Sequence, residues 1–581
     1  MNKSAALPTQ LDLRTLLADL FILGLVALLL IALVSTAQRW TASLIPAVEI
    51  HASLHYLPLY ALFSLSRAVI AYLLSLTFAI GVGYFAAKNK FAERLLLPLV
   101  AVGQSIPSMA IFAVMLLGLV ALFPLHNVGL ELASILLIFL SQTWDMTLSF
   151  YSSLKSIPPS FYELSVLSGM SRVQTLYKIE MPAAATGLAW NSMVSMAGGW
   201  FFLSAVESYS IGDQTFRVPG LRSFMSLAVE QNNYRAQFAA LITMLGIILF
   251  IDFVVWRPII ALTRKFSMDE ELGTEVALPL VSRLIRDSRF TKYAFCFARS
   301  ASQAIERLNW KYVRKKSHAV ALRLLPSTAG PSSREMLLGP FIFIVVVLIA
   351  FVLRHFYLLL KPVVLTDYIL IVKAAGATSL RVLASVTVAT LWTIPVGIGI
   401  GLNSKLTRIM QPIIQIAASF PAPMLFPIAI AFMTKFGAGP GLQASALILL
   451  SIQWYVLFNV LAGAVGMSQV IRENYRLMKV TQLDKWKQLY LPSIFPWLVT
   501  GLMTATGRAW NASIVAEYFT FHERTLTAFG LGSLLRQAVS KGNFSLFTAC
   551  VLVLITIALA TNQLLWKRIL HKAQTKYRFE R

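Results

Sequence analysis

The sequence predicts an all-α polytopic membrane protein built from two tandem six-helix modules, and three observations lead to that fold class. First, 57% of the 581 residues are hydrophobic and only 13% are charged, whereas a soluble domain normally has about 25% charged residues. Second, apolar runs long enough to cross a bilayer follow one another along the chain. Third, the later half repeats residues of the earlier half in register. This composition excludes a soluble enzyme and a disordered protein.

The apolar runs predict about twelve transmembrane helices, six in each half of the chain. A crossing needs about 20 mostly apolar residues to span a hydrocarbon core of about 30 Å. The candidate spans lie near residues 16–36, 62–87, 96–122, 131–152, 183–206, 236–262, 337–360, 380–402, 409–434, 441–466, 493–516 and 544–566. Helices with internal proline bend, so we expect kinks at Pro107, Pro395, Pro421 and Pro427.

Two basic segments stand out in a chain whose net charge is +25. The segment 263–336 holds 14 Lys/Arg against 7 Asp/Glu, and the tail 567–581 is similarly basic. Basic loops remain on the cytoplasmic side, so we expect both termini and this linker in the cytoplasm. The linker either lies against anionic lipid or has a regulatory docking role. The partner of the positive charge is then the lipid bilayer and not nucleic acid. The loop 354–379, expected outside, fits less well because it holds three basic residues and one acidic residue.

Paired Trp, Glu, Gly and Pro residues indicate an internal duplication. Seven pairs are 310 positions apart: Trp144/Trp454, Glu163/Glu473, Pro182/Pro492, Trp200/Trp510, Glu207/Glu517, Gly220/Gly530 and Trp256/Trp566. Earlier in each half the separation is 314: Arg67/Arg381, Asn89/Asn403, Pro98/Pro412 and Pro107/Pro421. We therefore expect a first module at 1–262 (core 60–262), a linker at 263–336 and a second module at 337–581 (core 375–570). An even number of crossings makes the modules parallel, with a pseudo-twofold axis along the membrane normal and the transport pathway between them.

Each module has a distinctive cytoplasmic loop before its fifth span, with an acidic residue nineteen positions before a proline. The first loop contains Glu163, Leu164, Ser165, Gly169, Ile179 and Pro182, and the second contains Glu473, Asn474, Tyr475, Lys479, Leu491 and Pro492. The pattern predicts a helix–turn–helix that projects from the membrane. Gly169 supplies the turn, and Pro182 suits the first turn of the next helix.

These loops resemble the pattern Glu-Ala-Ala, three residues, Gly, nine residues, Ile-x-Leu-Pro of inner-membrane permeases in binding-protein-dependent ABC importers. The first loop matches well, whereas the second has Lys479 in place of Gly. The segments Ser64–Arg67 and Ser379–Arg381, which we expect to open the second span of each module, are similar to the nitrate, sulfonate and taurine group of these permeases. So are the outer-loop segments Val218–Leu221 and Ala528–Leu531.

The resemblance implies a type I permease fold, a multi-pass protein of the bacterial cytoplasmic (inner) membrane, and a set of partners. Two separate ABC ATPase subunits would bind ATP-Mg and receive the two loops, and an extracytoplasmic binding protein would deliver a small anion such as a sulfonate or nitrate. The sequence contains no G-x-x-x-x-G-K-[ST] loop for nucleotide phosphates. We therefore expect a transport subunit that is not an enzyme and binds no cofactor or metal itself.

Four residues are candidates for the pathway or its outer mouth: Trp200, Glu207, Trp510 and Glu517. The 25 residues from Pro182 to Glu207 extend about 37 Å as a helix, which places Glu207 near the outer surface. Each Glu either contributes to the pathway, or caps a helix or pairs with an outer-loop arginine (Arg217, Arg222, Arg524 or Arg536). Each Trp either lines the cavity or anchors its helix at the interface. Arg67 and Arg381 are expected to snorkel to the interface.

An ion-coupled secondary transporter with six plus six helices is the alternative. It would need ionisable residues within the spans, yet Asp145 and Asp252 are the main examples. It also gives no reason for the repeated loop. The permease interpretation is therefore favoured.

Overall fold

The structure is a computed structural model that describes residues 50–124, 127–211, 214–263, 354, 357–467, 473, 481–521 and 524–576. The chain forms two compact units, one of Met1–Ile31 with Thr274–Pro362 and one of Ala32–Gly273 with Val363–Arg581. Nearly all the described residues, and both repeats, belong to the second unit. The expected first span at 16–36, most of the seventh at 337–360 and the linker beyond 263 lie outside the described residues.

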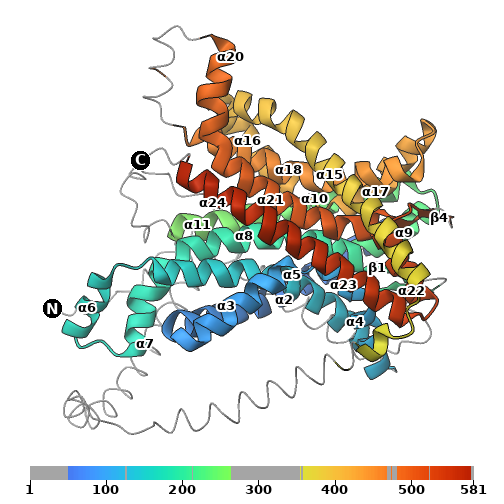
Figure 1. Cartoon of the computed structure of the whole chain (residues 1–581), viewed down its shortest axis with the longest axis horizontal. Coiled ribbons are helices and arrows are strands. Elements are labelled where there is room, and N and C mark those ends of the chain that lie inside the picture. The colour runs from blue at the N-terminus through green and yellow to red at the C-terminus, as the bar shows by residue number, and fades with distance from the viewer. Residues whose placement is uncertain are drawn as a thin grey trace, which may run out of the picture. The chain divides into compact units, whose positions relative to one another are not determined.

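The described helices follow the expected order of spans in both repeats (Figure 1). In the first repeat they are α2 (Leu57–Lys88), α3 (Lys90–Ser105), α4 (Ser108–Leu122), α5 (Val128–Lys155), α8 (Met181–Val206) and α10 (Tyr234–Ile251). In the second they are α15 (Leu365–Gly401), α16 (Ser404–Ser419), α17 (Ala422–Lys435), α18 (Pro440–Val465), α21 (Leu491–Ala516) and α23 (Phe544–Ala560).

Among the described residues, seven helices are long and apolar enough to span a membrane, or nine if each bent pair is one span. These nine match nine of the twelve expected spans, so the fold class is confirmed and the count of twelve is not. The expected span at 183–206 forms α8, which is not among the nine. Its buried faces hold polar residues such as Ser192 and Ser195, and these lower its hydropathy.

Each bent pair of helices breaks at a proline for which the sequence predicted a kink. The angle between α3 and α4 is 92°, and that between α16 and α17 is 87°. Pro107 and Pro421 stand directly before α4 and α17 as their N-caps, since proline lacks the N–H that an unbroken helix requires there. In contrast, Pro395 and Pro427 lie inside α15 and α17.

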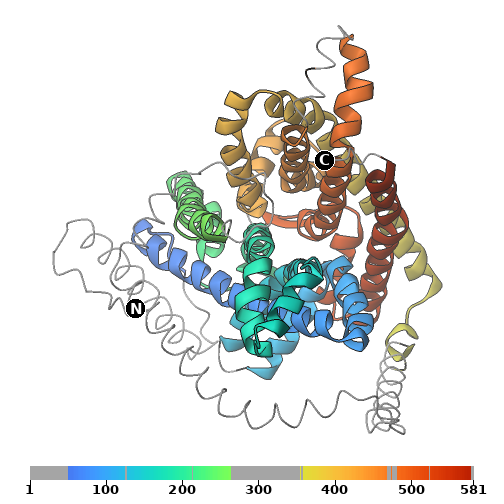
Figure 2. The ribbon, with the colours of Figure 1, turned by 90° about the vertical axis from the view of Figure 1, so that its left-hand side faces the viewer.

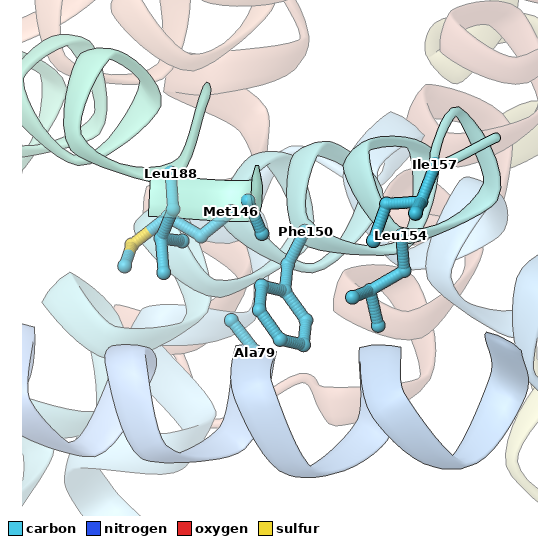
Figure 3. Close-up of a cluster of buried hydrophobic side chains, with 7 residues drawn as sticks. Ala79, Met146, Phe150, Leu154, Ile157 and Leu188 are labelled. Atoms are coloured by element: carbon cyan, nitrogen blue, oxygen red, sulfur yellow. The ribbon is translucent and has the colours of Figure 1, made fainter. Parts of the chain in front are cut away.

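The core of each repeat is a three-helix group. In the first repeat, Ala79 of α2, Phe150 of α5 and Leu188 of α8 belong to one buried cluster (Figure 3). A Cβ at Gly83 of α2 would lie 2.9 Å from Cδ1 of Phe150, so the small residue permits the close packing typical of membrane helices. The helices α15, α18 and α21 form the equivalent group in the second repeat.

The prediction that residues 354–379 form an outer loop is wrong for most of this segment. Helix α15 begins at Leu365, because the residues from 365 to 372 are mostly apolar and continue the span. Likewise α2 begins at Leu57 rather than near 62. Arg67 and Arg381 therefore lie inside long helices instead of at their starts.

Two short hairpins and two short helices were not predicted, and they lie at the end of each repeat that we expected to face outward, the outer end. Strands β1 (Ser208–Ile211) and β2 (Gln214–Arg217) pair antiparallel, and α9 (Leu221–Glu230) follows. The second repeat has β3 (Tyr518–Phe521), β4 (Arg524–Thr527) and α22 (Leu531–Ser540) at positions 310 later. Each of the four strands is four residues long, and the other regular elements of the described residues are helices.

The two repeats interlock through reciprocal contacts between their helices. Helix α4 contacts α21 and α22, while α17 contacts α8 and α9. Helices of the first repeat, blue to green, and of the second, yellow to red, meet along a shared interface (Figure 2). Asp252 accepts a hydrogen bond from Gln415 at 3.1 Å, and its counterpart Asn562 donates to Ser105 at 2.8 Å. The reciprocity agrees with a pseudo-twofold relation.

Candidate coupling loops and central cavity

The first loop folds as the expected helix and turn. Helix α6 (Pro159–Leu167) contains Glu163, Leu164 and Ser165 and is followed by Gly169 with φ of 65°. This backbone conformation favours glycine. Glu163 is exposed, and so are Leu164, Val166 and Leu167, at 54%, 77% and 85%. The helix thus presents apolar side chains with no covering partner among the described residues.

The second half of the loop differs from the expectation. A continuous helical run extends from Arg172 through α7 (Arg172–Thr175) and the π-helical turn η2 (Leu176–Glu180), which contains Ile179, into α8. Pro182 lies in the first turn of α8, as expected, but α8 continues the helical run directly after the π-helical turn instead of beginning a separate helix. A π-helical turn accommodates a residue that cannot join the α-helical ladder. In the second repeat, α20 (Gln482–Asp484) and η7 (Lys485–Tyr490) precede Leu491 and Pro492 in the same way.

A cation connects the first loop to two spans. Lys88, the last residue of α2, forms an ion pair with the buried carboxylate of Glu180. Its ammonium nitrogen also lies 4.4 Å from the centre of the Tyr162 ring in α6, within the range of a cation–π contact. Burial raises the pKa of the Tyr162 hydroxyl, which therefore stays protonated at neutral pH. Lys88 thus joins α2, α6 and the start of α8, and sequence analysis missed it.

The second loop is described only in part. Glu473 is helical and exposed, whereas Asn474, Tyr475 and Lys479 lie outside the described residues. In Figure 1, α20 lies at the top of the view and α6 and α7 lie at its lower left, whereas α9 and α22 lie at the right. The described parts of the two loops therefore both lie away from α9 and α22.

At the other end, Glu207 is buried among hydrogen-bond donors. Its Oε1 accepts from Ser64 at 2.5 Å and from Nη1 of Arg67 at 2.9 Å, and its Oε2 accepts from the backbone N–H of Arg222 at 3.0 Å. Glu207 therefore caps the first turn of α9, as the capping alternative expected. Among the described side chains, its ion-pair partner is Arg67. Snorkelling of Arg67 is wrong, since this side chain is buried against Glu131 and Glu207.

Glu517 repeats this arrangement in the second half. It accepts from Thr378 at 2.8 Å, from Arg381 at 2.8 Å and from the backbone N–H of Gly532 at 2.8 Å. Burial raises the pKa of both Glu207 and Glu517, while their hydrogen-bond and arginine partners oppose that shift. The two carboxylates thus form matching outer-end networks.

Gly220 and Gly530 are explained by these networks. Both have extended backbones, so φ does not require glycine. A Cβ at either position would instead lie 2.3 Å from the nearest carboxylate atom of Glu207 or Glu517. The carboxylates approach the backbone where only glycine leaves room.

The tryptophan pair is buried in both halves. Trp510 lines a central cavity of about 150 Å³ between the two repeats, to which Trp200 does not contribute. The cavity is also lined by Arg508 of α21 and by Asp145 of α5. The sequence had singled out Asp145 but not Arg508. In the described part of the chain, no group of three His, Cys, Asp or Glu residues could hold a metal ion.

Comparison with known proteins agrees with this architecture. Residues 79–256 and 393–571 each match the family described as the binding-protein-dependent transport system inner membrane component. The chain belongs to this family. Family membership makes it a multi-pass inner-membrane permease with two fused copies of the domain. The permease relatives that it resembles are transport subunits.

The curated relatives match parts of the chain. A nitrate import permease protein NrtB of Leptolyngbya laminosa is 26% identical over 191 residues, 32% of this chain and 64% of the relative. A bicarbonate transport system permease protein CmpB of Synechococcus elongatus is 31% identical over 24% of this chain and 49% of the relative. The taurine transport system permease protein TauC of Escherichia coli is 28% identical over 24% of this chain and 50% of the relative. The chain thus spans about half to two thirds of the length of these relatives.

Proposed function

We propose that this chain is the permease subunit of an ATP-driven ABC importer and that its two cytoplasmic loops engage two separate ATPase subunits. The observation that supports this most directly is α6, an exposed helix with apolar side chains held to α2 and η2 through Lys88. A free apolar helix at the end of a membrane domain suits insertion into a protein groove. Family membership favours this function over the ion-coupled alternative.

The mechanism is alternating access driven from outside the chain. ATP-Mg binds to the partner ATPases and closes them, and α6 moves with its ATPase. Because Tyr162 contacts Lys88 and Lys88 pairs with Glu180, movement of α6 is passed to α2 and to the helical run that ends as α8. The repeats then rock about their shared interface, with both termini in the cytoplasm. An extracytoplasmic binding protein supplies the substrate at the outer end.

The proposed substrate is a small anion such as a sulfonate or nitrate. The similar permeases are named for nitrate, bicarbonate and taurine, which are all small oxygen-rich acids. The cavity of about 150 Å³ between the repeats suits a solute of a few heavy atoms.

Co-purification with the partner ATPase tests the assignment of the loops. Glu163→Arg combined with Leu167→Asp places charge on the exposed face of α6, so we expect loss of the ATPase from the complex. The matched control is Glu230→Arg, an exposed acid at the end of α9, which leaves assembly intact. Native mass of the wild-type complex is expected to show one chain with two ATPase subunits. Unchanged assembly and ATP hydrolysis in the α6 variant would overturn the proposal.

A further inference from the structure

The central cavity lies where the two repeats meet and holds one charge of each sign. The lining residues come from the bend between α3 and α4, from α5 and α8, and from α21 and the segments at the end of α23. Arg508 is the only Lys or Arg among them, and Asp145 is the only Asp or Glu. Both side chains line this one cavity.

Arg508 stands at a place where the two repeats differ. Its guanidinium carbon lies 4.2 Å from the centre of the Tyr455 ring, and a cation–π contact of this kind uses the face of the guanidinium and not its N–H donors. The equivalent residue 310 positions earlier is Gly198. A Cβ on Gly198 would lie 2.6 Å from Nη1 of Arg508. The guanidinium of Arg508 thus packs against Gly198, the equivalent residue of the other repeat. Because Gly198 has no side chain, it leaves room for the guanidinium.

Asp145 marks a second difference between the repeats. Its Oδ1 accepts a hydrogen bond of 2.5 Å from Nε2 of Gln104, which orients the carboxylate. The equivalent residue in the second repeat is Tyr455, and the equivalent of Gln104 is Ala418. The carboxylate and its orienting amide are therefore confined to the first repeat.

Two further donors belong to this cavity. The indole N–H groups of Trp510 and Trp566 are buried and have no hydrogen-bond partner among the described residues, and both residues line the cavity. Buried donors are normally satisfied, so these two remain available to oxygen atoms of a bound group. They add to the donors of Arg508 and suit the oxygens of an acid anion.

We propose that this cavity is a binding site for a small zwitterion, with the acid group on Arg508 and the ammonium group on Asp145. A simple anion is attracted by Arg508 but repelled by the carboxylate in the same small cavity. A zwitterion is attracted by both charged residues. Because Arg508 belongs to one repeat and Asp145 to the other, the two residues also set the orientation of the bound zwitterion. This assignment rests on the proposed function and narrows its substrate class from anions in general to amino acids of the sulfonate or carboxylate type.

The experiment measures direct binding to the purified full-length chain in lipid nanodiscs, without an ATPase. The probes are 2-aminoethanesulfonate and ethanesulfonate, which differ by the ammonium group. We expect the wild type to bind the amino compound at least tenfold more tightly. Asp145→Asn should remove that preference, leaving ethanesulfonate binding equal or stronger. Arg508→Gln should abolish binding of both probes, while Arg508→Lys keeps measurable binding because it keeps the charge.

The controls separate loss of binding from loss of folding. Arg235→Gln changes an exposed arginine at the start of α10 and should bind both probes as the wild type does. Each variant is compared by thermal unfolding, so a binding loss counts only for a folded protein. Equal or tighter wild-type binding of ethanesulfonate, absence of binding by both probes, or unchanged binding in Arg508→Gln would overturn the proposal. Because no ATPase is present, failure of loop coupling leaves this result unaffected, and the two proposals can fail separately.

Discussion

The two repeats are nearly identical at their outer ends and different at their centre. At the outer ends a buried glutamate receives a hydroxyl, an arginine and a helix N–H in both copies. At the centre the pair Gly198 and Asp145 of one repeat stands opposite Arg508 and Tyr455 of the other. The comparison indicates that the duplicated scaffold keeps its symmetry where it holds the helices together. Symmetry is lost where the solute would pass.

The outer networks also differ in one respect, which gives the largest expected effect. Arg67 pairs with both Glu131 and Glu207. The position equivalent to Glu131 is Gly441, so among the described residues Arg381 pairs only with Glu517. Arg67→Ala would leave two buried carboxylates without a cation. Removing one partner of a buried pair costs about 3 to 5 kcal/mol. We expect Arg67→Ala to lower the thermal stability of the full chain more than Arg381→Ala.

Thermal unfolding of the chain in nanodiscs, with Arg235→Ala as the exposed control, measures this difference. Arg381 is less buried than Arg67, so water compensates part of its loss. Equal destabilisation by the two substitutions would contradict the claim that the second ion pair of Arg67, with Glu131, makes this arginine more important for stability than Arg381.

The glycines beneath the two carboxylates should behave alike. Gly220→Ala and Gly530→Ala each place a Cβ 2.3 Å from a carboxylate atom, and overpacking of this kind costs about 1 to 3 kcal/mol. Gly246→Ala in α10 is the matched control, because a Cβ there meets nothing within 4 Å. Unfolding temperatures of the three variants test the symmetry directly. A large difference between Gly220→Ala and Gly530→Ala would show that the outer ends are not equivalent.

Much of the scaffold could be predicted from the sequence because it depends on patterns that repeat. Apolar runs located nine described spans, and Pro107 and Pro421 located the breaks between bent pairs. Gly169 located the turn after α6. Glu207 and Glu517 were identified by their register, and capping was one of the alternatives considered for them.

The remaining features depend on contacts between distant segments. Arg67 looked like a surface residue because its acidic partners lie 64 and 140 positions away. Lys88 gave no signal, since its contacts with Tyr162 and Glu180 appear only after α2, α6 and η2 are assembled. Arg508 is one basic residue in an apolar run of the sequence. Its place in the cavity, against Gly198, appears only in the folded structure. The hairpins are too short for a period of two to be recognised.

The centre of the molecule offers a smaller test of the asymmetry. Gly198→Ala would push its new Cβ against the guanidinium of Arg508, 2.6 Å away. The flexible end of an arginine can shift, so stability should change little while the cation leaves its position. We expect about tenfold weaker binding of 2-aminoethanesulfonate, which corresponds to about 1.4 kcal/mol. Gly118→Ala, where a Cβ meets nothing within 4 Å, should bind normally. Unaltered affinity in Gly198→Ala would mean that the position of Arg508 is not critical.

The inner end supplies the smallest expected effect. Lys88 joins Tyr162 and Glu180 in the first repeat, but the residues equivalent to Lys88 and Glu180 are Leu402 and Tyr490. The second repeat therefore has neither the cation nor the carboxylate of this ion pair at the equivalent positions. Lys88→Met removes the cation at a partly exposed position, where water lowers the cost to Glu180. Movement of α6 would then be passed less efficiently to α2, so we expect a few-fold fall in substrate-stimulated ATP hydrolysis with assembly intact.

Leu402→Met is the matched control and should leave hydrolysis unchanged. If both substitutions lowered hydrolysis equally, the two loops would be driven in the same way, and the asymmetry would be confined to the central cavity.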